Sequence, residues 1–105
     1  MRPIHLATLD KPRPVLVLTR ALVRPHLTRV TVAPITRTIR GLSTEVAVGT
    51  HNGLDHASVV SCDNVVTIPR AALGRRIGRL MPEQEAELTN AIHAAFDLDD
   101  LPAQG

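Results

Sequence analysis

The stretch Pro14-Val15-Leu16-Val17-Leu18-Thr19 is the part of the chain that most strongly indicates the fold. It is a continuous run of β-branched and leucine side chains, bounded by prolines on one side and Arg20 on the other. Such a run is typical of a strand that is covered on both faces. We therefore expect a buried β-strand here, with further strands packed around it.

Four later segments also have strand character: residues 30–35, 44–48, 58–62 and 65–68. Residues 44–48 alternate polar and apolar side chains, which predicts a half-buried strand. Pro34 indicates that the second strand ends there or lies at a sheet edge. A turn is predicted at Asn52-Gly53. Because the strands are short and recur at short intervals, the sequence favours a compact barrel or sandwich.

The character changes after residue 72. Residues 73–80 read as a basic connector with two glycines. Pro82 stands where a first helical residue is often found, and the glutamates that follow suit the positive end of a helix dipole. A helix over about 82–97 would have one apolar face, formed by Leu88, Ala91, Ile92, Ala95 and Phe96. We expect one domain over 1–105, with a β-barrel over about 1–80 followed by this helix.

The charge is unevenly distributed along the chain. All 12 basic side chains and only four acidic ones lie in residues 1–80, so that part carries +8, whereas residues 81–105 carry −6. This basic body predicts a polyanionic partner. Phe96 is the only aromatic residue, which argues against an RNA-binding surface that stacks bases on aromatic rings. Eleven of the basic residues are Arg, whose planar fork suits phosphate.

Several kinds of site are disfavoured. Cys62 is the only cysteine, so it forms no internal disulfide, and we expect a buried, inert thiol. His51, Asp55 and His56 lie across a turn without standard metal-ligand spacing. We expect no metal and no cofactor. No apolar stretch approaches the length of a membrane span, so we expect a cytoplasmic protein.

Two segments carry a pattern suited to binding an anion. In Lys11-Pro12-Arg13-Pro14, the second proline fixes the backbone directly after Arg13. In the segment 34–41, hydroxyls alternate with guanidinium groups at the end of the second strand, at Thr36, Arg37, Thr38 and Arg40. Such donors suit a phosphate. The alternative is that Arg37 and Arg40 are solvated surface charges.

These segments also carry a resemblance to a known family. The chain resembles the MazF/PemK-type toxins, the endoribonuclease half of a type II toxin–antitoxin pair, over about residues 10–96. The matching stretches, in order, are Arg13-Pro14-Val15-Leu16-Val17-Leu18, Val32-Ala33-Pro34-Ile35-Thr36, Arg40-Gly41-Leu42 with Thr44-Glu45-Val46, Gly53-Leu54 with Ser58-Val59-Val60, Cys62-Asp63-Asn64 with Thr67-Ile68-Pro69, and Leu73-Gly74 through Ile77-Gly78.

The resemblance implies a mainly β fold, an SH3-like small barrel of the MazF/PemK/CcdB type with a C-terminal helix, working as a homodimer. It implies metal-independent, sequence-specific cleavage of single-stranded RNA by the 2′-hydroxyl, which leaves a 2′,3′-cyclic phosphate and a 5′-hydroxyl. The family's catalytic Arg and Thr match Arg13 and Thr36, and an RNA-contacting polar residue falls at Asn64. An antitoxin with an acidic, disordered segment would lie across the basic cleft.

The expected role of each site residue follows from the chemistry of RNA cleavage. In-line attack builds negative charge on the phosphate, which preorganised donors stabilise. We assign phosphate stabilisation and leaving-group protonation to Arg13, phosphate binding to Thr36, and RNA binding to Lys11, Arg37, Thr38, Arg40 and Asn64. The general base stays open; His5 is the only nearby histidine in sequence.

The loop before Arg13 is shorter than in many family members, with only Leu9-Asp10-Lys11-Pro12 remaining. This keeps tRNA and rRNA loops among the expected targets beside mRNA. A CcdB-like, non-catalytic gyrase poison is the alternative, although that relative depends on C-terminal residues including a Trp, and this chain contains none. A nucleic-acid-binding module without activity is a third reading, which the pairing of Arg13 with Thr36 disfavours.

Overall fold

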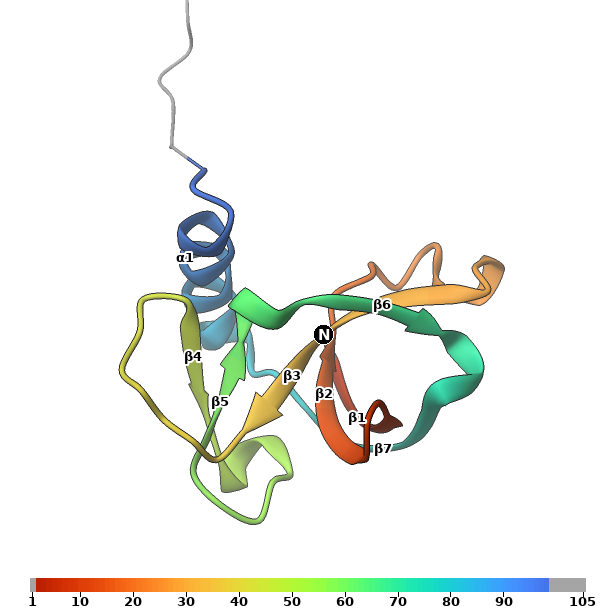
Figure 1. Cartoon of the computed structure of the whole chain (residues 1–105), viewed down its shortest axis with the longest axis horizontal. Helices are drawn as coiled ribbons and strands as arrows, with labels where there is room; N and C mark the ends of the chain where they lie inside the picture. Colours follow the sequence, from red (N-terminus) through yellow and green to blue (C-terminus); the bar gives the residue numbers. More distant parts are fainter. Residues whose placement is uncertain (1, 99–105) are drawn as a thin grey trace, which may run out of the picture.

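The structure is a computed structural model that describes residues 2–98. Within that range it contains seven β-strands and one α-helix (Figure 1). The strands are β1 (Pro3–Thr8), β2 (Pro12–Val17), β3 (Arg29–Thr36), β4 (Glu45–Val48), β5 (Ser58–Ser61), β6 (Val66–Pro69) and β7 (Leu73–Arg79), and the helix is α1 (Glu85–Ala95). The mainly β fold with a C-terminal helix is therefore confirmed.

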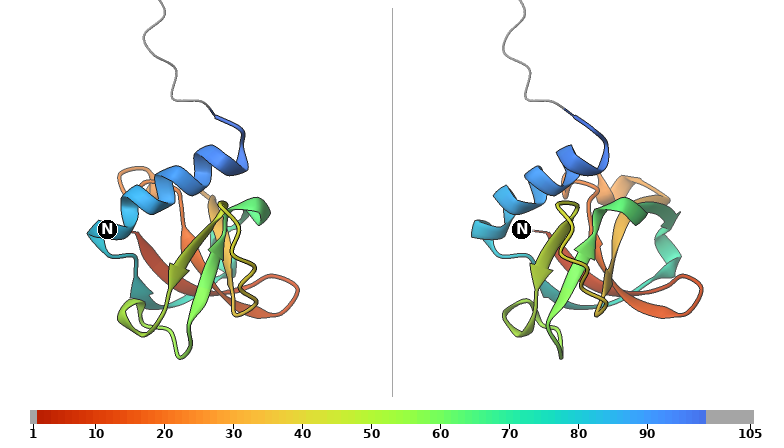
Figure 2. Two further views of the ribbon diagram at one scale, coloured as in Figure 1. Left: turned by 90° about the vertical axis from the view of Figure 1, so that its left-hand side faces the viewer. Right: turned by 60° about the vertical axis from the view of Figure 1, so that its left-hand side comes forward.

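The strands form one curved antiparallel sheet in the order β4-β5-β3-β2-β1-β7, with β6 added beside β3. Figure 2 shows the sheet curving around the core, with α1 lying across one end. β3 has two partners on the same side: residues 29–32 pair with β6, and Ile35 and Thr36 pair with β5. After this change of partner, Thr36 at the end of β3 lies at a groove in the surface.

The core lies on both sides of β2. Leu16 packs with Ile4, Ile35, Val60 and other apolar residues beneath α1. Val15 and Val17 pack on the opposite face in a second cluster with residues of β1, β3 and β6. Successive side chains of a strand point to opposite faces, so one apolar run serves both clusters. The prediction of a strand covered on both faces is confirmed, and burial of each such side chain contributes about 1.5–3 kcal/mol.

Residues 73–80 were expected to be a connector, and this expectation is wrong. Residues 73–79 form β7, which pairs with β1 along its length, with Ile4 opposite Gly78. The glycines that suggested a connector serve close packing instead. A Cβ on Gly78 would overlap the carbonyl oxygen of Asn52, and a Cβ on Gly53, at φ +87°, would overlap the carbonyl oxygen of Ile77. The strand is hard to recognise in the sequence because three exposed arginines and two glycines leave Leu73 and Ile77 as its only large apolar side chains.

Pro34 does not end β3, which continues to Thr36 at the centre of the sheet. The proline is tolerated because the β6 pairing stops at Val32 and the β5 pairing starts at Ile35. Between those points no partner on that side needs the missing N–H. Pro3–Thr8, which form β1, were not among the segments with strand character.

The helix begins later than expected, because Pro82–Gln84 form a single 3₁₀ turn before α1. Leu88 and Ala91 are buried as predicted. α1 ends at Ala95 and Phe96 caps it. Phe96 lies on the same side as Leu88 and Ile92, with which it lines a shallow hollow, but it is 56% exposed and not part of the buried core. No helix within residues 2–98 is long and apolar enough to span a membrane.

A buried asparagine joins the helix to the barrel. Asn52 is 2% exposed; its Oδ1 accepts from the N–H of Gly49, and its Nδ2 donates to the carbonyl of Arg79 and to Oε1 of Gln84. Gln84 also donates from Nε2 to the carbonyl of Ala47. A buried amide with all these bonds made is stabilising, whereas one left unpaired would cost about 1–3 kcal/mol.

Candidate active site

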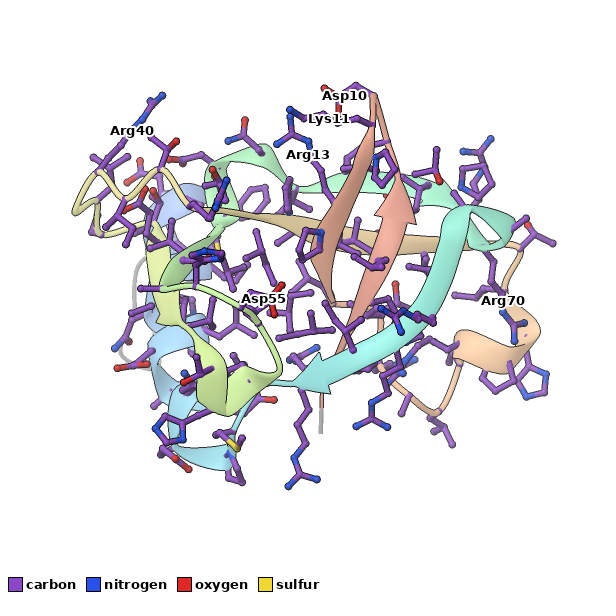
Figure 3. The ribbon with its side chains drawn as sticks, turned by 90° about the horizontal axis from the view of Figure 1, so that it is seen from below. Asp10, Lys11, Arg13, Arg40, Asp55 and Arg70 are labelled. Carbon is purple, nitrogen blue, oxygen red and sulfur yellow. The ribbon has the colours of Figure 1, made fainter. Side chains whose placement is uncertain are left out.

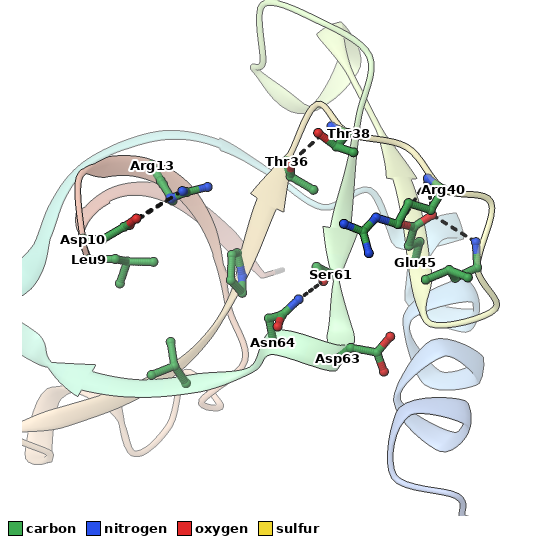
Figure 4. A pocket seen from close by; sticks show the side chains of 13 residues that line it. Leu9, Asp10, Arg13, Thr36, Thr38, Arg40, Glu45, Ser61, Asp63 and Asn64 are labelled. Carbon is green, nitrogen blue, oxygen red and sulfur yellow. Dashed lines mark hydrogen bonds and ion pairs between the residues drawn. The ribbon is translucent and has the colours of Figure 1, made fainter.

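A groove of about 610 Å³ opens where the β1–β2 turn, the end of β3 and the β5–β6 connection meet (Figure 4). We call it the main groove. The residues that line it are Leu9, Asp10, Arg13, Pro34, Thr36, Thr38, Arg40, Leu42, Glu45, Ser61, Asp63, Asn64 and Val66. Figure 4 shows Asp10 and Arg13 on one side and Arg40 and Asp63 on the other, with Asn64 between them.

Arg13 is fixed at the entrance of β2 by a carboxylate in the preceding turn. Its Nε donates to Oδ1 of Asp10 at 3.0 Å and its Nη2 donates to Oδ2 at 3.3 Å. Oδ1 also accepts from the N–H of Lys11. The bond from Arg13 is the main reason that the pKa of Asp10 is lowered. This fork holds the guanidinium in one orientation, and among residues 2–98 no group accepts a bond from Nη1.

Thr36 is the last residue of β3, opposite Val59 of β5. Its Oγ1 accepts from the N–H of Thr38 at 3.1 Å. Because the hydroxyl already accepts this bond, its own hydrogen is left to donate into the groove. The hydroxyl is thus oriented by the strand end and by the backbone that follows.

The loop after β3 is held by Glu45. Its Oε1 accepts from the N–H of Arg40 at 3.2 Å and from the N–H of Leu42 at 3.1 Å. A carboxylate that accepts from two backbone amides fixes the loop much as it would cap a helix. The bonds place Arg40 at the wall of the main groove.

Asp63 and Asn64 form the wall at the β5–β6 connection. Oδ2 of Asp63 accepts from Oγ1 of Thr44 at 2.6 Å, and Nδ2 of Asn64 donates to Oγ of Ser61 at 2.8 Å. Both side chains are exposed. Each bond uses one polar atom of the side chain and leaves the other one facing solvent.

A second hollow, of about 650 Å³, shares Arg13, Thr36 and Thr38 with the main groove. Its other polar lining residues are Lys11, Arg37, Asp55, His56 and Ser58. Arg13 and Thr36 therefore stand where the two hollows meet. A chain of nucleotides could occupy both hollows with one phosphate at this junction. Figure 3 shows Lys11 and Arg13 at the same edge of the molecule.

The structure brings the residues singled out from the sequence to these two hollows. Arg13, Thr36, Thr38, Arg40 and Asn64 line the main groove. Lys11 and Arg37 line only the second hollow. His5 lies in neither; its Nδ1 is 2.9 Å from the carbonyl oxygen of Gly74.

Four further residues at the two hollows were not predicted from the sequence: Asp10, Glu45 and Asp63 in the main groove, and His56 in the second hollow. The signal for Asp10 was its spacing three residues before Arg13 in a turn. The signal for Asp63 was its position directly before Asn64. Glu45 and His56 offered none, because Glu45 at the start of β4 and His56 in the loop before β5 reach the site only through the path that the fold gives those segments. Within residues 2–98 no group of three or more His, Cys, Asp or Glu residues is arranged to hold a metal ion.

Cys62 lies just beneath the groove wall and is 1% exposed. Burial, and secondly the charge of Asp63, raises its pKa to about 11. The folded protein should therefore keep the thiol protonated between pH 9 and 11 while the unfolded chain ionises it. We expect the free energy of unfolding to fall by about 2 kcal/mol over that interval. Denaturant unfolding at stepped pH checks this, and Cys62→Ala should flatten the dependence.

Comparison with known proteins gives consistent matches. Residues 5–96 match the family model described as PemK-like, MazF-like toxin of type II toxin-antitoxin system. The chain is 67% identical over 99 residues to "Endoribonuclease MazF3" of Mycobacterium tuberculosis, covering 94% of this chain and 96% of that protein. It is 41% identical over 90 residues to "Probable endoribonuclease MazF2" of the same organism, covering 85% and 88%.

Solved structures match as well. The Mycobacterium tuberculosis toxin MazF-mt6 superposes with a TM-score of 0.92 at 66% identity, covering 93% of this chain and 99% of that one. An endoribonuclease in complex with its cognate antitoxin, from a Mycobacterial species, superposes with a TM-score of 0.84 at 25% identity, covering 95% of each chain.

Proposed function

Because the chain belongs to the PemK-like, MazF-like toxins of type II toxin–antitoxin systems, an endoribonuclease family, we propose that it cuts single-stranded RNA at the junction of its two hollows. The observation that carries the proposal is the meeting of Arg13 and Thr36 at that junction. The two residues come from different strands, and each is oriented by a second residue, Asp10 or Thr38. The gyrase-poison alternative is not favoured.

The reaction needs no nucleophile from the protein. The 2′-hydroxyl of the RNA attacks the adjacent phosphorus, the bond to the 5′-oxygen breaks, and a 2′,3′-cyclic phosphate and a 5′-hydroxyl result. Negative charge grows on the nonbridging oxygens, and donors fixed beforehand stabilise it without reorganisation. Arg13 supplies the charge and protonates the leaving 5′-oxygen, while Thr36 donates a hydrogen bond to the phosphate. Solvent takes up the proton that the 2′-hydroxyl loses and returns one to Arg13, so the step balances.

The RNA backbone is held by the cations on either side of this pair. Lys11 and Arg37 lie in the second hollow, and Arg40 with Thr38 and Asn64 in the main groove. Because no Phe, Tyr or Trp lines either hollow, phosphate pairing and hydrogen bonds replace base stacking. Only residues 9–11 separate β1 from β2, and this short turn would leave room for exposed loops of tRNA and rRNA as well as mRNA.

The protein works in the cytoplasm as a homodimer that a cognate antitoxin neutralises. Support for the antitoxin comes from the related endoribonuclease solved in complex with its own. An acidic, disordered antitoxin segment would complement the groove's arginines and compete directly with RNA. Dimerisation is proposed from family membership.

The direct test is incubation with end-labelled single-stranded RNA in EDTA, followed by mapping of the new ends. We expect cleavage that is unaffected by EDTA and leaves 2′,3′-cyclic phosphate and 5′-hydroxyl ends. RNA that stays intact, or that is cut only with added Mg²⁺, would contradict the proposal. RNA that carries a 2′-deoxy sugar at the cleaved position is the substrate control and should not be cut.

Replacing Thr36 with Val should lower the cleavage rate by about 10- to 100-fold, because the isosteric side chain keeps the shape of the strand end and removes the donor. Single-turnover rates measure this. Thr67→Val is the matched control, since Thr67 lies on β6 outside both hollows and bonds Thr31. Equal rates for the Thr36→Val variant and the wild type would remove Thr36 from the mechanism.

A further inference from the structure

We propose that Asp63 makes the main groove select cytosine or adenine over uracil and guanine at one nucleotide on the Arg40 side of the scissile phosphate. The inference rests on the proposed function and names the chemistry of the substrate that the groove takes. Cytosine and adenine share an edge on which an exocyclic amino donor stands next to a ring-nitrogen acceptor. Uracil and guanine present a ring N–H next to a carbonyl oxygen instead.

Three carboxylates line the main groove, and two of them are already occupied. Asp10 is held by the fork of Arg13, and Glu45 accepts from two backbone amides. Asp63 is different. Its Oδ2 accepts from Thr44, while among residues 2–98 no donor reaches Oδ1. Asp63 therefore offers the groove a charged acceptor whose orientation Thr44 fixes.

The part of the RNA that contacts Asp63 is a base rather than the backbone. A phosphate is repelled by a carboxylate and attracted by the guanidinium groups of Arg13 and Arg40. Arg40 lies on the same side of the groove as Asp63 (Figure 4). When the backbone follows the cations, the neighbouring base edge is turned to the acceptor.

Hydrogen-bond complementarity then selects among the bases. Oδ1 of Asp63 accepts from an amino group, as carboxylates do from N4 of cytosine. Arg40 can donate to the acceptor nitrogen beside it. Uracil would set a carbonyl oxygen against the carboxylate. Guanine in the same position would set its O6 against the carboxylate and its ring N–H against the guanidinium of Arg40. Oδ1 of Asn64 adds a second acceptor to the same wall, because its Nδ2 is bonded to Ser61.

The test is cleavage of a single-stranded RNA pool with randomised positions, read by sequencing the new ends. For the wild type we expect, at one position, a preference of about 10- to 100-fold for cytosine or adenine, the range of one hydrogen bond to a charged group. In Asp63→Asn the amide oxygen keeps the bond from Thr44 and the amide nitrogen replaces Oδ1. The preference at that position should then shift to uracil or guanine, and the other positions should be unchanged.

Two controls separate this inference from the function on which it rests. Glu87→Gln removes a carboxylate from the exposed side of α1 and should leave every preference unchanged. Wild-type protein should also cut more slowly, by about 10-fold or more, when the cytidine at that position is replaced by its analogue without the amino group. Equal preferences for wild type and Asp63→Asn, or equal rates for cytidine and the analogue, overturn the inference alone. Wild-type protein that cuts no RNA overturns the proposed function as well.

Discussion

We expect replacement of Arg13 with Ala to lower the rate of RNA cleavage by about a thousandfold, the loss that follows when a charged donor to the reacting phosphate is removed. Arg13 is the one arginine of the main groove that a carboxylate holds in a bidentate fork. Its charge is therefore placed before the substrate arrives. Single-turnover rates at saturating enzyme isolate this loss from any change in RNA binding.

Arg13→Lys distinguishes charge from geometry. Lysine keeps the positive charge, but it cannot take both oxygens of Asp10 and still direct a donor to the phosphate, so we expect an intermediate rate. Arg29→Ala is the matched control, because Arg29 is an exposed arginine at the far end of β3 and lines neither hollow. An Arg13→Ala protein that cuts within about tenfold of the wild-type rate would contradict the assignment.

We expect replacement of Gly78 with Ala to destabilise the protein by about 3–5 kcal/mol, a large part of the stability of a domain of this size. The added methyl group would overlap the backbone carbonyl of Asn52, which cannot rotate away as a side chain does. Relief of the overlap must separate β7 from the loop that holds Asn52. That movement would also strain the bonds from Asn52 to Arg79 and Gln84.

Denaturant unfolding measures this loss, and Gly49→Ala is the control. A Cβ on Gly49 would meet only the Cα of Ala57, at 3.9 Å, which is ordinary contact. We therefore expect a much smaller loss for Gly49→Ala than for Gly78→Ala. A Gly78→Ala protein as stable as the wild type would show that the loop and β7 are not packed as described.

The sequence predicts the centre of this fold better than its edges. β2 is recognisable because Val15, Leu16 and Val17 are all buried, and an unbroken run of apolar residues is the direct mark of a strand buried on both faces. β7 is not recognisable, because it lies at the edge of the sheet and its glycines and exposed arginines serve contacts with distant segments. Strand propensity reflects a residue's own conformational preferences. It carries no information about a contact with a distant segment, such as the carbonyl of Asn52 that lies against Gly78.

The same distinction holds for the site. Arg13 and Thr36 were identified because each belongs to a local motif that the family resemblance also matches. Asp63 and Glu45 were not, because what matters for each is the partner it binds. Asp63 is an available acceptor only because Thr44 occupies one oxygen, and Glu45 is structural because both its backbone partners fold towards it. Such pairings become visible only in three dimensions.

The pairing of β1 with β7 has a consequence for how the protein is made. β1 is the first strand in the sequence, yet its partner on one side extends to Arg79. β1 cannot make this pairing until residues 73–79 have been synthesised, although β2 with Arg13 is made long before. The sheet that carries Arg13 and Thr36 is therefore completed by its last strand, so assembly of the whole sheet is a late event in the folding of the growing chain.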